Sequence, residues 1–217
     1  MIKAAIFDMD GLMIDSEPLQ SKSIEKILKE YGVEPDYDEL GLVQIIGMTA
    51  KENWKILKDK HNISEDLDTL VEKKQHAYFE ILKDNLVPMP GLLGLLKLLK
   101  QKKLKLGIAS SSRLEHIETV LKGLGVRNYF DIIISGESLE NSKPHPEIYL
   151  TAARELDVDP EDAIALEDAH LGVLSASGAG MKVIAVPNSS TVKQDFSKAT
   201  LKVSSLEDIN WDILSKL

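Results

Sequence analysis

The sequence has no cysteine among its 217 residues, so disulfide bonds, thiolate nucleophiles and cysteine-ligated zinc sites are excluded. It also lacks any stretch that approaches the roughly 20 apolar residues needed to cross a bilayer. The N-terminus shows no signal-peptide pattern, because its apolar run is short and acidic residues follow it. We therefore expect a cytoplasmic protein that makes no contact with a membrane.

Basic residues are the minority in this chain. There are 26 lysines and arginines against 35 acidic residues, which gives a net charge of −9 at pH 7. No basic run occurs, whereas proteins bind nucleic acids and anionic membranes through clusters of lysine and arginine. The charge therefore argues against nucleic acid as a partner. A phosphorylated small molecule is still compatible, since a bound cation and one lysine can make a single cleft positive.

Hydrophobic residues make up 43% of the chain, which is enough for a packed core. Strand-like and helix-like segments alternate after residue 91 and, together with a strand near the N-terminus, predict a parallel sheet with helices on both faces. The expected strands are 2–8, 104–109, 132–135, 163–166, 183–186 and 201–203. The expected helices are 92–102, 114–124, 146–156, 169–177 and 206–217.

The stretch between residues 16 and 87 differs from the rest, because every periodic segment in it predicts a helix. The expected fold class is therefore α/β: a Rossmann-like parallel-sheet core with an inserted α-helical cap domain. The core would comprise residues 1–15 and 88–217, and the cap residues 16–87. Segments 12–15 and 87–91 would link the two domains and act as a hinge.

Polar and charged residues follow the predicted strands at their carboxyl ends. They are Asp8-Met9-Asp10-Gly11, Ser110-Ser111-Ser112-Arg113, Lys143 within the loop NSKPHPE, and Glu167-Asp168. Ligands of open α/β sheets bind outside the carboxyl ends of the strands, so we expect these groups to converge on one edge. Carboxylates, hydroxyls and a lysine gathered in one place are suited to binding a phosphoryl group.

The aspartates Asp8 and Asp10 follow a buried strand at positions i and i+2, so their side chains point the same way and repel each other. A bound cation would offset this repulsion. Mg²⁺ prefers oxygen ligands, with few carboxylates and several waters. Asp8, Asp168 and the backbone carbonyl of Asp10 would supply those oxygens. Glu167 is either a further ligand or a support for the others.

The same groups can perform phosphoryl transfer. Asp8, held against phosphorus by a metal and Lys143, can attack it and form an aspartyl phosphate. Asp10 can protonate the leaving oxygen and then take a proton from water. Lys143, Ser110 and Ser111 would neutralise and hydrogen-bond the phosphoryl oxygens.

Some of these polar residues also have simpler structural roles. Ser16 is expected to cap the helix that begins there, and Gly32 to end it. Asp168 could cap the helix 169–177. Ser112 is a turn or cap residue in one interpretation and a contact to a distal substrate group in the other.

The ordered set Asp8-Met9-Asp10-Gly11, Ser110, Lys143-Pro144 and Glu167-Asp168 resembles the four motifs of the haloacid dehalogenase superfamily of phosphotransferases. The stretches FDMDG, IASSSR, SKPHPEIY and ALEDAHLG are most similar to its β-phosphoglucomutase-like phosphatases, and the resemblance covers nearly the whole chain. It implies that Asp8 is the nucleophile, Asp10 the general acid and base, and Mg²⁺ the cofactor. The implied metal ligands are Asp8, Asp10 and Asp168, with Glu167 as a candidate.

The resemblance implies a Mg²⁺-dependent phosphatase of small phosphorylated metabolites, such as sugar or nucleoside monophosphates. The alternative is a β-phosphoglucomutase, which shares all four motifs. Mutases of that subgroup have a histidine where this chain has Gln20 and an arginine where it has Ala50, whereas Lys74 matches a cap lysine. A non-catalytic phospho-aspartate signalling domain is a further alternative, but such domains are shorter and lack a cap.

Substrate recognition would fall to polar residues of the cap and to two core residues beside the phosphate site. These candidates are Glu17, Gln20, Met48, Thr49, Lys51, Lys74, Ser112 and Arg113. They suggest a small, polar leaving group. We expect the protein to be a monomer.

Overall fold

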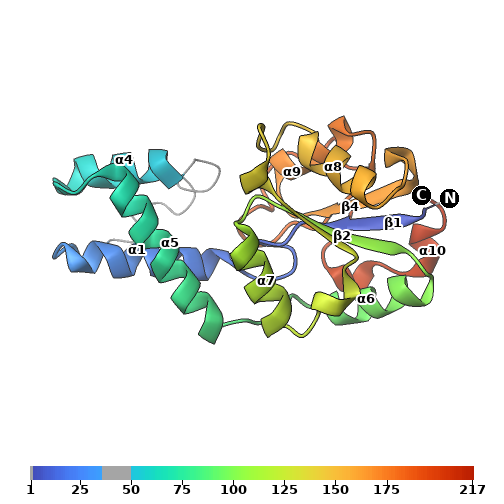
Figure 1. Cartoon of the computed structure of the whole chain (residues 1–217), viewed down its shortest axis with the longest axis horizontal. Helices are drawn as coiled ribbons and strands as arrows, with labels where there is room; N and C mark the ends of the chain where they lie inside the picture. The colour runs from blue at the N-terminus through green and yellow to red at the C-terminus, as the bar shows by residue number, and fades with distance from the viewer. Residues whose placement is uncertain (1, 36–49) are drawn as a thin grey trace. The chain divides into compact units, whose positions relative to one another are not determined.

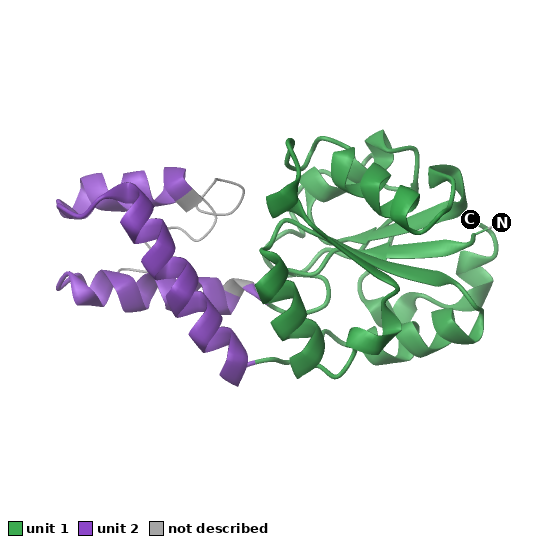
Figure 2. Cartoon of the chain, viewed as in Figure 1, with its two compact units in different colours: residues 1–15, 86–217 green, residues 16–85 purple. Residues whose placement is uncertain are grey.

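The computed structural model describes residues 2–35 and 50–217, and the chain divides into two compact units (Figure 2). Unit 1 consists of Met1–Asp15 and Leu86–Leu217, and unit 2 of Ser16–Asn85. The chain therefore leaves unit 1 after its first strand, forms unit 2 and returns. Among the described residues, no helix combines the length and the apolar character that crossing a membrane requires.

Unit 1 is built on a six-stranded sheet in which neighbouring strands are parallel. The strands are β1 (Ala4–Phe7), β2 (Lys105–Ser110), β3 (Ile132–Ser135), β4 (Ala163–Glu167), β5 (Lys182–Ala185) and β6 (Leu201–Lys202). Their order across the sheet is β3-β2-β1-β4-β5-β6. Every residue of β1 and β4 is buried, as expected for central strands covered on both faces. The expected α/β class is confirmed.

Helices cover both faces of this sheet (Figure 1). They are α6 (Leu92–Gln101), α7 (Leu114–Gly123), α8 (Glu147–Glu155), α9 (His170–Gly178) and α10 (Trp211–Leu214). On one face, Ala4 and Ala165 of the strands share a buried cluster with Tyr149 and Ala152 of α8 and Ala176 of α9. The 3₁₀ turns are η1 (Arg127–Tyr129), η2 (Gly136–Ser138), η3 (Pro160–Asp162) and η4 (Leu206–Asp208).

The expected continuous helix 206–217 is wrong. The structure has the turn η4 and then the short helix α10, with Ile209 in an extended conformation between them (φ −85, ψ 114). Asp208 and Ser205 form a capping box that closes the first turn. The side chain of Asn210 accepts a hydrogen bond from the N–H of Ile213 and starts a new helix. Side-chain caps therefore divide a segment whose apolar spacing suits one helix.

Unit 2 contains the helices α1 (Glu17–Glu30), α4 (Ala50–His61) and α5 (Leu67–Asp84). Their apolar faces meet in a core formed by Ile24, Ile27, Leu28, Trp54, Leu57, Ile63, Leu70 and Ala77. α1 ends before Gly32, which has φ +72, as predicted. Ser16 precedes α1, but its side chain makes no capping bond. Its backbone is already helical (φ −82, ψ −22), whereas a capping residue has an extended backbone.

The two segments where the chain crosses between the units are paired with each other inside unit 1. Ile14 forms bridges with Asp10 and with Pro88, and the N–H of Met89 donates to the carbonyl of Met13 at 2.8 Å. Leu12, Met13 and Ile14 are buried. Residues 12–14, which were expected to belong to a hinge, are therefore part of the core of unit 1.

Gly91 gives a stability prediction, because α6 begins immediately after it. It has φ +86, and a Cβ there would lie 2.4 Å from the backbone N of Glu207. We expect Gly91→Ala to lower the free energy of unfolding by about 1–3 kcal/mol, the usual cost of a strained backbone position. Gly94→Ala in the same helix meets nothing within 4 Å and should stabilise by about 0.5–1 kcal/mol. Urea unfolding followed by circular dichroism measures both changes; equal effects would contradict the prediction.

Candidate active site

Three carboxylates meet at the carboxyl ends of the two central strands. Asp8 follows β1, and Glu167 and Asp168 end β4 and follow it. One side-chain oxygen from each lies within 4.8 Å of the others, and all three residues are buried. Because β1 and β4 are adjacent and parallel, residues 159 to 160 positions apart in the sequence arrive at the same edge. The predicted convergence of Asp8, Glu167 and Asp168 is present in the structure.

Lys143 connects this carboxylate cluster to the loop after β3. Its Nζ donates to Asp8 Oδ1 at 2.7 Å, to Glu167 Oε1 at 2.6 Å and to the carbonyl of Ala109 at 3.1 Å. Burial alone would lower the pKa of Lys143, but the charges of Asp8 and Glu167 outweigh it and raise the pKa above its ordinary value. Lys143 is therefore a permanent positive charge beside the candidate nucleophile.

The crowding of carboxylates changes their protonation. Burial is the largest cause that raises the pKa of Asp8 to about 7; Lys143 opposes this shift, and the charge of Glu167 adds to it. Burial, followed by the charges of Asp8 and Glu167, also raises the pKa of Asp168 well above its usual range. Ionising both Asp8 and Asp168 is therefore unfavourable without a further positive charge. Buried, hard oxygen donors of this kind fit a divalent cation such as Mg²⁺.

The raised pKa of Asp8 gives a prediction about pH and metal removal. Between the ordinary value of 3.8 and about 7, the folded protein keeps a proton that the unfolded chain has released. The contribution of Asp8 to stability therefore falls as pH rises through this range. In EDTA, Asp8→Asn should gain stability relative to wild type as pH increases from 4 to 8, and Mg²⁺ should stabilise wild type more than the variant. Thermal unfolding across that pH range measures this; a pH-independent difference would contradict it.

Asp10 lies outside the group of three converging carboxylates. Its Oδ2 accepts a hydrogen bond from the hydroxyl of Ser112 at 2.7 Å. Ser112 in turn donates its N–H to Ser110 Oγ at 3.1 Å and accepts at its carbonyl from Ser135 Oγ at 2.7 Å. Ser112, which was a candidate for substrate contact, thus holds the carboxylate of Asp10.

The other residues of the loop after β2 differ in exposure. Ser110 is buried, with only 1% of its surface exposed, whereas Ser111 and Arg113 are exposed. Arg113 lies at the start of α7, and its Nε is 3.7 Å from Glu137 Oε1. Of Ser110 and Ser111, the two candidate phosphate ligands of this loop, only Ser110 is buried at the end of the strand.

Glu167 has two donors on one oxygen. Its Oε1 accepts from Lys143 and also from the hydroxyl of Tyr149 at 2.5 Å. A Cβ at Gly172 of α9 would lie 2.0 Å from this carboxyl group, so the glycine provides the space that Glu167 occupies. Glu167 thus contacts Lys143 and Tyr149 and is also one of the three carboxylates of the cluster. Tyr149 was not predicted as a site residue. The signal was its place at the end of the stretch SKPHPEIY, since a buried tyrosine hydroxyl usually finds a hydrogen-bond partner.

Asn188 is a second site residue that sequence reasoning missed. Its Nδ2 donates to Asp168 Oδ2 at 2.8 Å and to the carbonyl of Gly11 at 3.1 Å. The expectation that Asp168 caps α9 is wrong: the N-cap position is Ala169, and the N–H of His170, the first residue of α9, donates to Gln194 Oε1 at 2.7 Å. Asn188 comes shortly after β5. Its position at the carboxyl end of a strand, where ligands of such sheets bind, could have identified it as a site residue.

The candidate cap residues lie in unit 2 or outside the described part of the chain. Lys74 is largely buried and donates to Gln20 Oε1. Lys51 is exposed and pairs with Asp68 at 2.7 Å. Met48 and Thr49 lie outside the described residues, as does the side chain of Glu17. Within unit 2, the structure therefore joins Gln20 with Lys74, whereas Lys51 is paired with Asp68.

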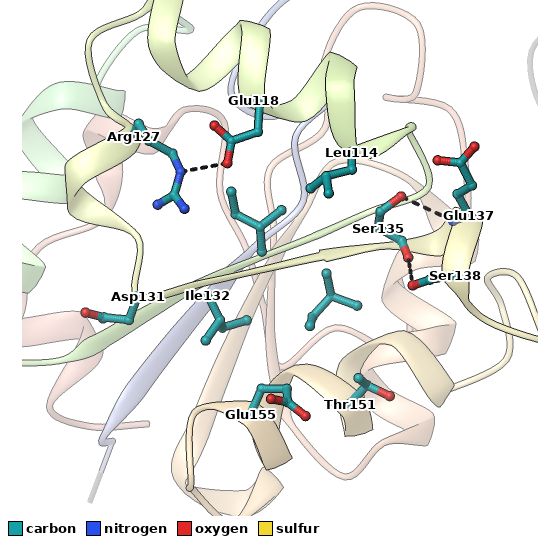
Figure 3. A pocket seen from close by; sticks show the side chains of 12 residues that line it. Leu114, Glu118, Arg127, Asp131, Ile132, Ser135, Glu137, Ser138, Thr151 and Glu155 are labelled. Atoms are coloured by element: carbon teal, nitrogen blue, oxygen red, sulfur yellow. Dashed lines mark hydrogen bonds and ion pairs between the residues drawn. The ribbon is translucent and has the colours of Figure 1, made fainter.

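A separate groove of about 630 Å³ runs along the edge strand β3, between α7 and α8 (Figure 3). None of the predicted site residues lines it. Its carboxylates have cationic neighbours: Glu118 contacts Arg127, Asp131 contacts Lys100, Glu137 is near Arg113, and Glu155 is near Arg154. The groove is thus distinct from the carboxylate cluster and carries little unbalanced charge.

The family model of haloacid dehalogenase-like hydrolases matches residues 5–186. The chain belongs to this family. The predicted resemblance is therefore confirmed, and this haloacid dehalogenase-like hydrolase is an enzyme of the phosphoric monoester hydrolase type, as its curated relatives are named.

Two relatives and one solved structure illustrate the similarity of this hydrolase to known proteins. A phosphorylated carbohydrates phosphatase of Thermotoga maritima is 34% identical over 187 residues, which cover 84% of each chain. Hexitol phosphatase B of Escherichia coli K12 is 33% identical over 217 residues, covering 96% of this chain and 94% of the relative. The crystal structure of β-phosphoglucomutase from Clostridium difficile has a TM-score of 0.80 at 28% identity, covering 100% of this chain and 96% of that one.

Proposed function

We propose that this hydrolase is a Mg²⁺-dependent phosphatase that releases inorganic phosphate from small phosphorylated carbohydrates through an aspartyl phosphate on Asp8. The observation that carries the proposal is the contact of Asp8 with Lys143 inside a buried cluster with Asp168. Asp8, Asp168 and the backbone carbonyl of Asp10 would hold the cation. When bound, Mg²⁺ supplies positive charge that balances the phosphoryl oxygens.

In the first step, an Asp8 carboxylate oxygen forms a bond to phosphorus as the ester P–O bond breaks. Asp10 gives a proton to the departing oxygen, so the carbohydrate leaves as an alcohol. Lys143, Ser110 and Ser111 would bind the phosphoryl oxygens through this transfer. Glu167 keeps Lys143 in place, since it accepts one of the three hydrogen bonds that Nζ donates in the structure.

In the second step, Asp10 takes a proton from a water molecule whose oxygen attacks phosphorus. The bond between Asp8 and phosphorus breaks, and inorganic phosphate and the free carboxylate are produced. The same side chain thus serves as acid and then as base, which requires a carboxyl group that is held near the site without being a side-chain metal ligand. The hydrogen bond from Ser112 to Asp10 supports this role.

The names of the relatives support a phosphorylated sugar or sugar alcohol as substrate. Two are named for phosphorylated carbohydrates and hexitols, and another for fructose 1-phosphate. Gln20 and Lys74, which contact each other in unit 2, offer a neutral amide and an ammonium group suited to hydroxyl recognition. We propose that this pair, with Lys51, Glu17, Met48 and Thr49 as further candidates, selects the leaving group.

A β-phosphoglucomutase is the second candidate, favoured by the solved mutase structure and by the presence of Lys74. A mutase must hold a bisphosphate while it turns over, and a bidentate arginine suits that task. This chain has Ala50 at the position expected for the arginine, and Gln20 replaces the histidine. These two differences favour hydrolysis over isomerisation.

One assay distinguishes the two candidates. With Mg²⁺, β-glucose 1-phosphate and a trace of the bisphosphate, we expect any turnover to give inorganic phosphate and no accumulation of glucose 6-phosphate. In a substrate panel, sugar and sugar-alcohol phosphates should exceed nucleoside monophosphates in kcat/KM by about tenfold or more. Efficient isomerisation with little phosphate release would establish the mutase instead.

A further inference from the structure

Asn188 touches both loops that carry the proposed Mg²⁺ ligands. It follows β5, the neighbour of β4 in the sheet. One amide group, Nδ2, donates to Asp168 Oδ2 at 2.8 Å and to the carbonyl of Gly11 at 3.1 Å. Gly11 directly follows Asp10, whose carbonyl is a proposed ligand. Asn188 therefore links the loop after β1 to the loop after β4.

The orientation of the Asn188 amide is determined by its other end. Its Oδ1 accepts hydrogen bonds from the N–H of Ser190 at 2.8 Å, the N–H of Thr191 at 3.1 Å and the hydroxyl of Thr191 at 3.3 Å. Backbone N–H groups only donate, so the atom facing them must be the oxygen. The NH₂ group consequently faces Asp168 Oδ2 and the carbonyl of Gly11, to which it donates.

The contact between these loops is also close. Gly11 has φ +85, and a Cβ there would lie 2.3 Å from Asp168 Oδ2 and 2.8 Å from Asn188 Nδ2. Asp168 is itself 95% buried, with 5% of its surface exposed. The glycine, the carboxylate and the amide thus occupy a space in which none can shift far without moving another.

We propose that Asn188 is a positioning residue that holds the Asp168 carboxylate and the Asp10–Gly11 loop in register for binding a divalent cation. The inference rests on the proposed Mg²⁺ site. Groups that hydrogen-bond to metal ligands orient them, and their loss costs about 10–100-fold in metal affinity. The hydroxyl of Thr191 supports the turn from the other side: it accepts from the N–H of Asn188 at 3.1 Å and donates to Asn188 Oδ1 at 3.3 Å.

The test measures binding of Mn²⁺ alone, without substrate, from the electron paramagnetic resonance signal of the free ion. Asn188→Ala removes the amide and with it the hydrogen bonds of both Nδ2 and Oδ1. Asn188→Ser keeps a hydroxyl that can accept from the N–H groups of residues 190 and 191, but it is too short to bridge to Asp168 and Gly11. Thr191→Val is the matched control, since it removes the two hydrogen bonds that the Thr191 hydroxyl makes within the turn and leaves the amide contacts to Asp168 and Gly11.

We expect the Mn²⁺ dissociation constant to rise about 10–100-fold in both Asn188 variants and less than about threefold in Thr191→Val, with all three unfolding cooperatively. Wild-type affinity in Asn188→Ser would overturn the inference, and so would an equal loss in Thr191→Val, because the turn alone would then explain the effect. If the wild-type protein bound no Mn²⁺, the proposed metal-dependent function would be refuted together with the inference. The two failures are therefore distinguishable.

Discussion

Replacing Asp8 with asparagine should abolish turnover, with a loss of at least about 10⁴-fold, as expected for removal of a nucleophile. An amide cannot attack phosphorus and is a poor ligand for Mg²⁺. The structure supports this expectation because Asp8 follows the central strand and accepts a 2.7 Å hydrogen bond from Lys143. Rapid acid quench of the wild-type enzyme with ³²P-labelled substrate should trap phosphate on Asp8, and the variant should trap none.

Asp212→Asn is a control for this experiment, since Asp212 is an exposed residue at the start of α10. It makes the same carboxylate-to-amide change and should keep full activity. An Asp8→Asn enzyme that turns over at a near wild-type rate would refute the assignment of the nucleophile. The circular dichroism spectrum of Asp8→Asn should match that of wild type, because asparagine has the same shape and its oxygen can still accept from Lys143.

Asp10→Asn should slow turnover by about 10²–10⁴-fold, the usual contribution of a general acid and base. The defect should be smaller for p-nitrophenyl phosphate, since protonation of a good leaving group contributes less to the rate. Asparagine can still accept the hydrogen bond from Ser112, and the backbone carbonyl is unchanged. We therefore expect Mn²⁺ binding to change by less than about threefold, in contrast to the loss expected on removing a group that orients a metal ligand.

Steady-state kinetics on one sugar phosphate and on p-nitrophenyl phosphate, together with Mn²⁺ titration, check this expectation. An equal loss on the two substrates would show that Asp10 does not protonate the leaving oxygen. A parallel loss of Mn²⁺ affinity would instead show that its side chain is needed at the metal site. Ser112→Ala is a useful companion, because it removes this one hydrogen bond to the Asp10 carboxylate while keeping every proposed catalytic group.

The strands and most of the helices of the core could be predicted from the sequence, because each of them is marked by residues next to one another in the chain. The apolar run before Asp8 marks a buried strand, and Gly32 ends a helix because it adopts a positive φ. The carboxyl ends of parallel strands lie at one edge of the sheet, so the proximity of Asp8, Lys143 and Asp168 could be predicted from the sequence. The prediction of one C-terminal helix over 206–217 was wrong because the apolar spacing suits a continuous helix, whereas the side chains of Ser205 and Asn210 cap two separate turns.

The sequence by itself determined the fold class, the insertion after the first strand and the residues of the carboxylate cluster, since periodicity, turn residues and ordered motifs encode them. Only the tertiary structure decided the partners of each group: Ser112 for Asp10, Tyr149 for Glu167, and Asn188 for Asp168. Asn188 and Gly11 are 177 positions apart. A hydrogen bond over such a separation depends on the paths of separate loops in space, and no local pattern of residues records those paths.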